Sequence, residues 1–135
     1  AKKAKEKCDQ AMAALVKSRE RIKSLEQSRI KMQALYADYL ARSIEAEKNS
    51  LNMHETVNFR GFLQQIQTLI KRVDVDLEHA KFELDVLKGN LVAAEKKRIQ
   101  METLHEQDLR RIQEAATKRE QREMDAAGVM MFNLK

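Results

Sequence analysis

The chain of 135 residues has no proline, no tryptophan and only three glycines. A globular domain of ordinary composition contains about 5% proline and 7% glycine, which serve mainly in turns. All-β and α/β folds need many such turns, so the near absence of these residues excludes both classes. The composition therefore predicts an all-α protein made of one or a few long helices.

Cysteine and long apolar segments are scarce as well. Cys8 is the single cysteine, so the chain cannot form an internal disulfide, which fits a reducing compartment. No apolar run approaches the ~20 residues that a membrane-spanning helix needs, and we expect no direct membrane insertion. The chain starts with alanine and shows no signal-peptide pattern, so we expect it to begin inside a longer protein.

The charged residues, 26 basic and 21 acidic, give a net charge of +5 that is unevenly distributed. Residues 1–48 have a net charge of +5, residues 49–95 of −2 and residues 96–135 of +2. Acidic residues interrupt the basic ones throughout, and no aromatic residues accompany the basic ones for base stacking. This pattern favours a solvated helix exterior, and we expect no nucleic-acid partner.

Apolar residues recur at alternating spacings of three and four, the heptad pattern of helices that bury a narrow seam. In the first half nine of eleven positions fit: Ala4, Cys8, Ala11, Leu15, Ser18, Ile22, Leu25, Arg29, Met32, Tyr36 and Tyr39. In the second half all eleven are apolar: Phe59, Leu63, Ile66, Ile70, Val73, Leu77, Ala80, Leu84, Leu87, Leu91 and Ala94. Both halves are therefore predicted to be coiled-coil helices.

The two series do not share one register, because the first, when extended, is one residue out of step at Phe59. The interruption coincides with Asn49 and Asn52, whose side chains bond readily to nearby backbone and favour turns. Asn52 with Glu55 is also a variant of the capping box that starts helices. A short turn at this point would fold the two helices into an antiparallel coiled-coil hairpin.

The sequence thus predicts a single domain, one coiled-coil hairpin over residues 1–135. Helix one is expected at about 1–48, the turn at 49–52 or as far as 58, helix two at 53–127, and an apolar tail at 128–135. Gly128 would cap the second helix. Helix one, at ~70 Å, is shorter than helix two, at ~110 Å. About 25 residues of helix two would then lack a partner helix, and this basic end is either solvated or binds a partner.

No constellation of residues points to catalysis or to a bound cofactor. The three histidines, His54, His79 and His105, are 25 and 26 residues apart, so nothing brings them together on a metal. The three glycines are isolated, which excludes a glycine-rich phosphate loop. We expect a protein that is not an enzyme and that holds no metal and no cofactor.

The apolar stripe widens near the predicted turn. Six apolar residues lie there in addition to the seam: Ile30, Leu35, Leu40, Ile44, Phe62 and Leu69. An isolated hairpin has no third element to cover them. They form either a protein-binding surface or a thicker core for the hairpin.

Two segments resemble one known family. The first is Val57-Asn58-Phe59-Arg60-Gly61-Phe62-Leu63-Gln64-Gln65-Ile66, preceded by Leu35, Tyr36 and Tyr39, and the second is Arg119-Glu120-Gln121-Arg122-Glu123-Met124-Asp125. In their order and separation along one hairpin they resemble the FliJ family of flagellar export proteins, over nearly the whole chain. That family forms a two-helix antiparallel coiled coil similar to the central stalk of rotary ATPases.

The resemblance implies two protein contacts. The end with the chain termini would enter the ring of the FliI-type flagellar export ATPase and promote its assembly and turnover. The matched positions are Arg119, Gln121, Arg122, Glu123 and Asp125. A surface near the turn would contact the FlhA-type export gate protein through Met32, Leu35, Tyr39, Phe62, Ile66, Leu69 and Val73.

The resemblance also implies a role and a place in the cell. Family members escort export chaperones, which would be further partners. A monomer in the cytoplasm, peripheral to the inner membrane at the flagellar base, is expected. Two other interpretations stay open. One is the equivalent stalk of a virulence injectisome, and the other is a structural coiled-coil homodimer with parallel chains and no role in export.

Overall fold

The computed structural model describes residues 2–49 and 53–134. All of these except Asn49 are helical, in two helices, α1 (Lys2–Lys48) and α2 (Met53–Leu134), and the described residues include no strand. The two helices pack against each other as a hairpin. The all-α hairpin predicted from the lack of proline and glycine and from the heptads is confirmed.

The chain divides into two compact units, and each contains parts of both helices. The first, which we call the hairpin unit, is Gln10–Leu91 and includes most of α1 and the first part of α2. The second, the terminal unit, consists of Ala1–Asp9 and Val92–Lys135.

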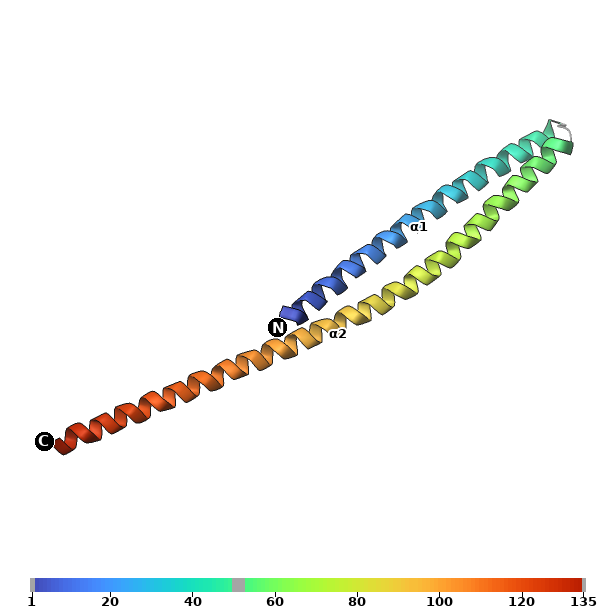
Figure 1. Cartoon of the computed structure of the whole chain (residues 1–135). Helices are drawn as coiled ribbons and strands as arrows, with labels where there is room; N and C mark the ends of the chain where they lie inside the picture. Colours follow the sequence, from blue (N-terminus) through green and yellow to red (C-terminus); the bar gives the residue numbers. More distant parts are fainter. Residues whose placement is uncertain (1, 50–52, 135) are drawn as a thin grey trace. The chain divides into compact units, whose positions relative to one another are not determined.

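In the hairpin unit the two helices run side by side in opposite directions (Figure 1). Each helix buries one stripe, at the heptad positions conventionally labelled a and d, and exposes most of its remaining positions. The buried residues of this unit are Leu15, Ser18, Ser43, Ala46, Ile66, Val73, Leu77 and Ala80. The other predicted seam positions are half-buried, as expected for a core only two helices thick.

Each helix keeps its own heptad register up to the turn, so the change of register falls at the turn itself. In α1 the seam continues through Ser43 and Ala46, and in α2 it is already present at the half-buried Thr56. The Asn49 amide donates a hydrogen bond to the Glu45 carbonyl oxygen, 3.1 Å away, as the helix ends. The remainder of the predicted turn, 50–52, and with it the proposed Asn52 cap, lies outside the described residues.

Arg29, which interrupts the predicted seam of α1, forms an ion pair with Asp74 of α2. Arg21 and Glu83 form a second ion pair between the helices, at 3.5 Å, and the Gln67 amide donates to the Tyr36 hydroxyl at 3.1 Å. The charged side chains of both pairs are at least 41% exposed, so each pair contributes only about 0–1 kcal/mol. Apolar burial along the seam is therefore the main source of stability.

The second helix does not end at Gly128. It continues to Leu134, seven residues beyond the end predicted from the glycine. One glycine inside a helix costs about 1 kcal/mol relative to alanine. The residues that follow, 129–132, are apolar side chains compatible with a helix, so the glycine alone does not stop it.

Candidate protein-binding site

An aromatic cluster connects the two helices of the hairpin unit near the turn. The centroid of the Tyr39 ring is 4.4 Å from that of Phe62 and 6.4 Å from that of Phe59, with tilted planes. The guanidinium carbon of Arg42 lies 5.3 Å from the Tyr39 centroid, and the same side chain pairs with Asp38 at 3.2 Å. Aromatic pairs and cation–π contacts contribute roughly 0.5–1.5 kcal/mol each. The cluster therefore fixes how the two helices meet at this point.

Beside this cluster, an apolar surface follows one flank of the hairpin unit. Arg21 and Glu83 both occupy heptad position g, and their ion pair shows that the g positions of the two helices face each other. Leu35, Phe62 and Leu69 occupy the same position, and their exposed fractions are 42%, 39% and 43%. We call these three residues, together with Tyr39, the apolar flank.

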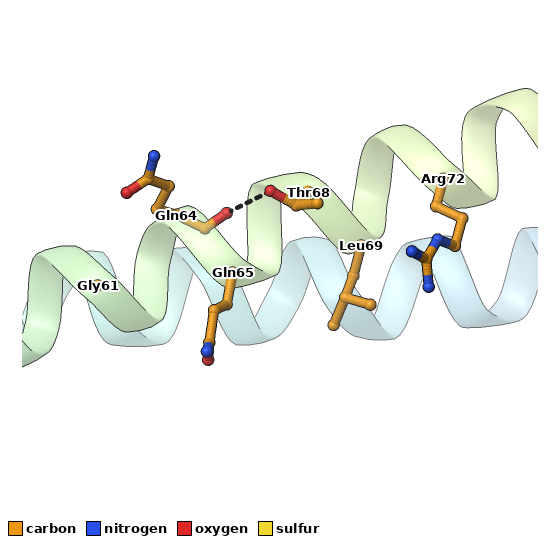
Figure 2. Close-up of a pocket in the computed structure, with 6 residues that line it drawn as sticks. All are labelled: Gly61, Gln64, Gln65, Thr68, Leu69 and Arg72. Carbon is orange, nitrogen blue, oxygen red and sulfur yellow. Dashed lines mark hydrogen bonds between the residues drawn. The ribbon is translucent and has the colours of Figure 1, made fainter.

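A shallow hollow on α2 lies next to the apolar flank (Figure 2). It is lined by Gly61, Gln64, Gln65, Thr68, Leu69 and Arg72. Gly61 has no side chain to fill the hollow, and the Thr68 hydroxyl is turned back to donate to the Gln64 carbonyl oxygen at 3.0 Å. In Figure 2 Gln65, Leu69 and Arg72 extend from the same side of the helix. A partner would meet apolar, amide and cationic groups here.

The seven residues predicted to contact an export gate have different environments. Leu35, Phe62 and Leu69 are exposed, and Met32 and Tyr39 are half-buried. Ile66 and Val73 are only 3% and 7% exposed, because both occupy heptad position d and face α1. The structure thus brings part of the predicted set together on the apolar flank and places the rest inside the seam.

Sequence reasoning missed two members of the aromatic cluster as site residues. Phe59 was assigned only to the seam, although its ring is near that of Tyr39. Arg42 was not selected at all. Its position three residues after Tyr39, on the same helix face, was the available signal.

In the terminal unit, α2 has no buried or half-buried side chain from residue 99 to residue 134. Ala4 and Cys8 of α1 are buried and Ala94 and Arg98 of α2 are half-buried, but every side chain from residue 99 to residue 134 is exposed. Its side-chain hydrogen bonds are local, such as Arg98 to Glu102 at 3.1 Å. The rest of α2 in this unit therefore presents its whole circumference to solvent.

The residues predicted to contact an ATPase ring all lie in this exposed part. They are Arg119, Gln121, Arg122, Glu123 and Asp125. Gln121 donates a hydrogen bond to Asp125 at 3.4 Å, within one turn of the helix. All five side chains are free to meet a partner.

The distribution of charge in the terminal unit differs from the expected basic end. Residues 99–134 contain five basic and seven acidic side chains, so this part of the helix is slightly acidic. The positive charge is concentrated instead in lysines 2, 3, 5 and 7 and in the basic triplet 96–98. A partner of the exposed helix would therefore meet an alternation of both signs rather than a basic surface.

The model of the family described as Flagellar FliJ protein matches the chain over residues 1–135. The chain belongs to the FliJ family. No curated protein and no solved structure matches the chain significantly.

Membership of the FliJ family makes the chain a component of flagellar protein export. Neither helix, over the residues described, has a stretch long and apolar enough to cross a membrane. Within 2–49 and 53–134, no three His, Cys, Asp or Glu side chains come together where they could hold a metal ion.

Proposed function

We propose that this FliJ-family chain is a stalk-like, non-catalytic protein that inserts its terminal unit into the ring of the flagellar export ATPase. There it promotes assembly of the ring and hydrolysis of ATP, and it connects the ring to the export gate. The observation that carries this proposal is the exposure of every side chain over residues 99–134 of a continuous helix. A helix without tertiary contacts gains little stability of its own, so a surrounding partner is the natural source of its order.

The ring contact would use the alternating charges near the end of α2. Arg119 and Arg122 supply cations, and Glu123 and Asp125 supply anions, within two turns of one exposed helix. Gln121 adds an amide. Such mixed charges would give electrostatic complementarity and register against the inner surface of a ring more than raw affinity.

The gate contact would use the apolar flank of the hairpin unit. Leu35, Phe62 and Leu69 are large apolar side chains on one flank, and Tyr39 is already held in place by the aromatic cluster. Preordered aromatic and aliphatic groups are typical of binding hot spots. Met32, Ile66 and Val73 would support this surface from the seam.

Other parts of the proposal depend on the family alone. The chain would act in the cytoplasm, at the inner membrane below the flagellum, and would escort export chaperones. The burial of the seam within the hairpin unit supports a monomer over a parallel homodimer, since the same heptad positions cannot also bury a second copy. Membership of the flagellar family favours a flagellar over an injectisome system.

The proposal is tested by mixing the full chain with the purified flagellar export ATPase. We expect more hexamer by size-exclusion chromatography and faster ATP hydrolysis as the chain is added. If neither the oligomeric state nor the rate of hydrolysis changes, the proposed role is wrong.

A further inference from the structure

The outer face of α1 carries a second surface, distinct from the apolar flank. Between residues 27 and 44, heptad positions b, e and f, on the side opposite the apolar flank, contain no charged residue, whereas position c carries Lys31 and Asp38. The residues at b, e and f are Gln27, Ile30, Gln33, Ala34, Ala37, Leu40, Ala41 and Ile44, and all eight are exposed. We call this row the uncharged strip. In a chain that is 35% charged, such a face is out of keeping with a solvated helix exterior.

The uncharged strip borders a groove between the two helices. Ile30 lies in a hollow lined by Glu26, Arg29, Asp74, Leu77, Glu78 and Lys81. Gln33 lies in the next hollow, lined also by Tyr36, Gln67, Ile70 and Lys71. The Arg29–Asp74 and Tyr36–Gln67 contacts cross between the helices at these points. The strip and the groove together form one surface on the flank opposite Phe62 and Leu69.

The spacing within the strip suits another helix. Ile30, Ala37 and Ile44 are seven residues apart, so they recur at the same heptad position. Alanines separate the large side chains, and small residues let a second helix approach closely while its side chains fit between the isoleucines. Ile30 is 66% exposed and Ile44 48%, so each has much apolar surface left to bury. Ile30 and Ile44 are about 21 Å apart along the helix, a distance of four turns.

The charges on the α2 side of this surface indicate which charge a bound partner helix would carry. From Thr56 to Val73, α2 contains no acidic residue, and its basic residues on the side of the strip are Arg60 and Lys71. Lys71 lines the groove, and Arg60 occupies the same heptad position as the groove residue Gln67. Acidic side chains lie at the Ile30 end of the groove, where Glu26, Asp74 and Glu78 line the hollow, and at Glu47 beyond the other end of the strip. A helix lying over the strip between Gln33 and Ile44 would therefore meet positive charge, from Lys71 and Arg60, along its edge toward α2.

We propose that the uncharged strip and its groove bind one amphipathic helix of a partner protein, with acidic residues on the part of its edge that faces Lys71 and Arg60 of α2. The complex is a local three-helix bundle on the hairpin unit. This surface shares no residue with the proposed gate and ATPase contacts, and it does not depend on the proposed function.

The test uses the full chain and a synthetic helical peptide of 21 residues, with leucines on one face and glutamates along one edge of that face. A matched peptide has lysines in place of the glutamates. By fluorescence anisotropy, the acidic peptide is expected to bind at least tenfold more tightly than the basic one.

The substitution Ala37→Glu, at the centre of the strip, is expected to weaken binding at least tenfold. The control Val75→Glu, at a residue 51% exposed on α2, is expected to leave binding unchanged.

A second variant tests whether binding depends on the charge of the groove as well as on the shape of the strip. Lys71→Glu is expected to weaken binding of the acidic peptide and to strengthen binding of the basic one. Equal affinity for the two peptides, or full affinity in Ala37→Glu, would overturn the proposal. So would sedimentation showing that the chain forms a dimer which Ala37→Glu dissolves, because the occupant would then be a second copy.

Discussion

Phe62 and Ile66 are four residues apart on α2, yet 39% of one and only 3% of the other is exposed. The difference follows from heptad position, since Phe62 is beside the seam and Ile66 is in it. A rotation of about 40° around the helix thus separates a side chain that can bind a partner from one that holds the hairpin together. Leu69 and Val73 differ in exposure for the same reason, since Leu69 lies beside the seam and Val73 in it.

Replacing Ile66 by alanine is expected to destabilise the hairpin. The side chain is buried in the seam, and truncating a buried isoleucine to alanine costs about 2–5 kcal/mol. Because the core is only two helices thick, the lower part of that range is expected. Urea unfolding followed by circular dichroism measures the change, with Val75→Ala as the exposed control. Equal effects of the two substitutions would contradict the assignment of Ile66 to the core.

Phe62→Ala combined with Leu69→Ala is expected to weaken binding to the cytoplasmic part of the export gate protein at least tenfold. Both side chains are partly exposed, at 39% and 43%, and lie beside the buried seam rather than in it, so the hairpin should stay folded. Stimulation of the export ATPase should be unchanged, because that contact is assigned to the terminal unit. Calorimetry of gate binding beside an ATPase assay tests this, and loss of both activities, or of neither, would refute the division of roles.

At the scale of the helices, α1 and α2 could be predicted in some detail. The heptad series identified the stripe that each helix buries, down to Leu15 in α1 and Ala80 in α2. Periodicity succeeds here because one neighbouring helix decides burial at every turn. It did not locate the end of α2, since Gly128 is a weak signal inside an exposed helix.

The candidate site was less predictable than the helices. The predicted gate contacts included Ile66 and Val73 along with Phe62 and Leu69. Resemblance to a family does not distinguish residues of the seam from residues of the surface. The role of Arg42 depends on the position of the Tyr39 ring, which itself depends on a residue of the other helix. Contacts between the helices near the turn therefore required the structure.

Gly89→Ala is expected to stabilise the hairpin unit by up to about 1 kcal/mol. The glycine is inside α2, where alanine has the higher helix propensity. A Cβ atom at this position would meet no other atom within 4 Å, so no clash opposes the gain. Thermal unfolding should show a melting temperature higher than that of the unsubstituted chain. A lower melting temperature would indicate that the glycine is needed for a bend.

Removal of residues 99–135 is expected to leave the hairpin unit folded and to abolish stimulation of the export ATPase. No side chain from 99 to 134 is buried, so the hairpin loses no packing when they are deleted. Urea unfolding of the shortened chain should give the same midpoint as the full chain, while the rate of ATP hydrolysis falls to that of the ATPase alone. Stimulation by the shortened chain would show that the activity does not depend on residues 99–135.

For the molecule as a whole, the two units differ in what they offer a partner. The hairpin unit presents the apolar flank on one side and the uncharged strip on the other. The terminal unit presents a bare helix of mixed charge. Separate surfaces of different chemistry on one chain suit the proposed role of joining several components of an export machine.

Site-specific cross-linking to the export ATPase tests the central claim, that the terminal unit enters the ring, most directly. A photo-reactive amino acid replaces Arg119 in one variant and Val75 of the hairpin unit in another, both at exposed positions. After illumination with the assembled ATPase, we expect a cross-linked product from position 119 and little or none from position 75. A product from position 75 but none from position 119 would contradict it.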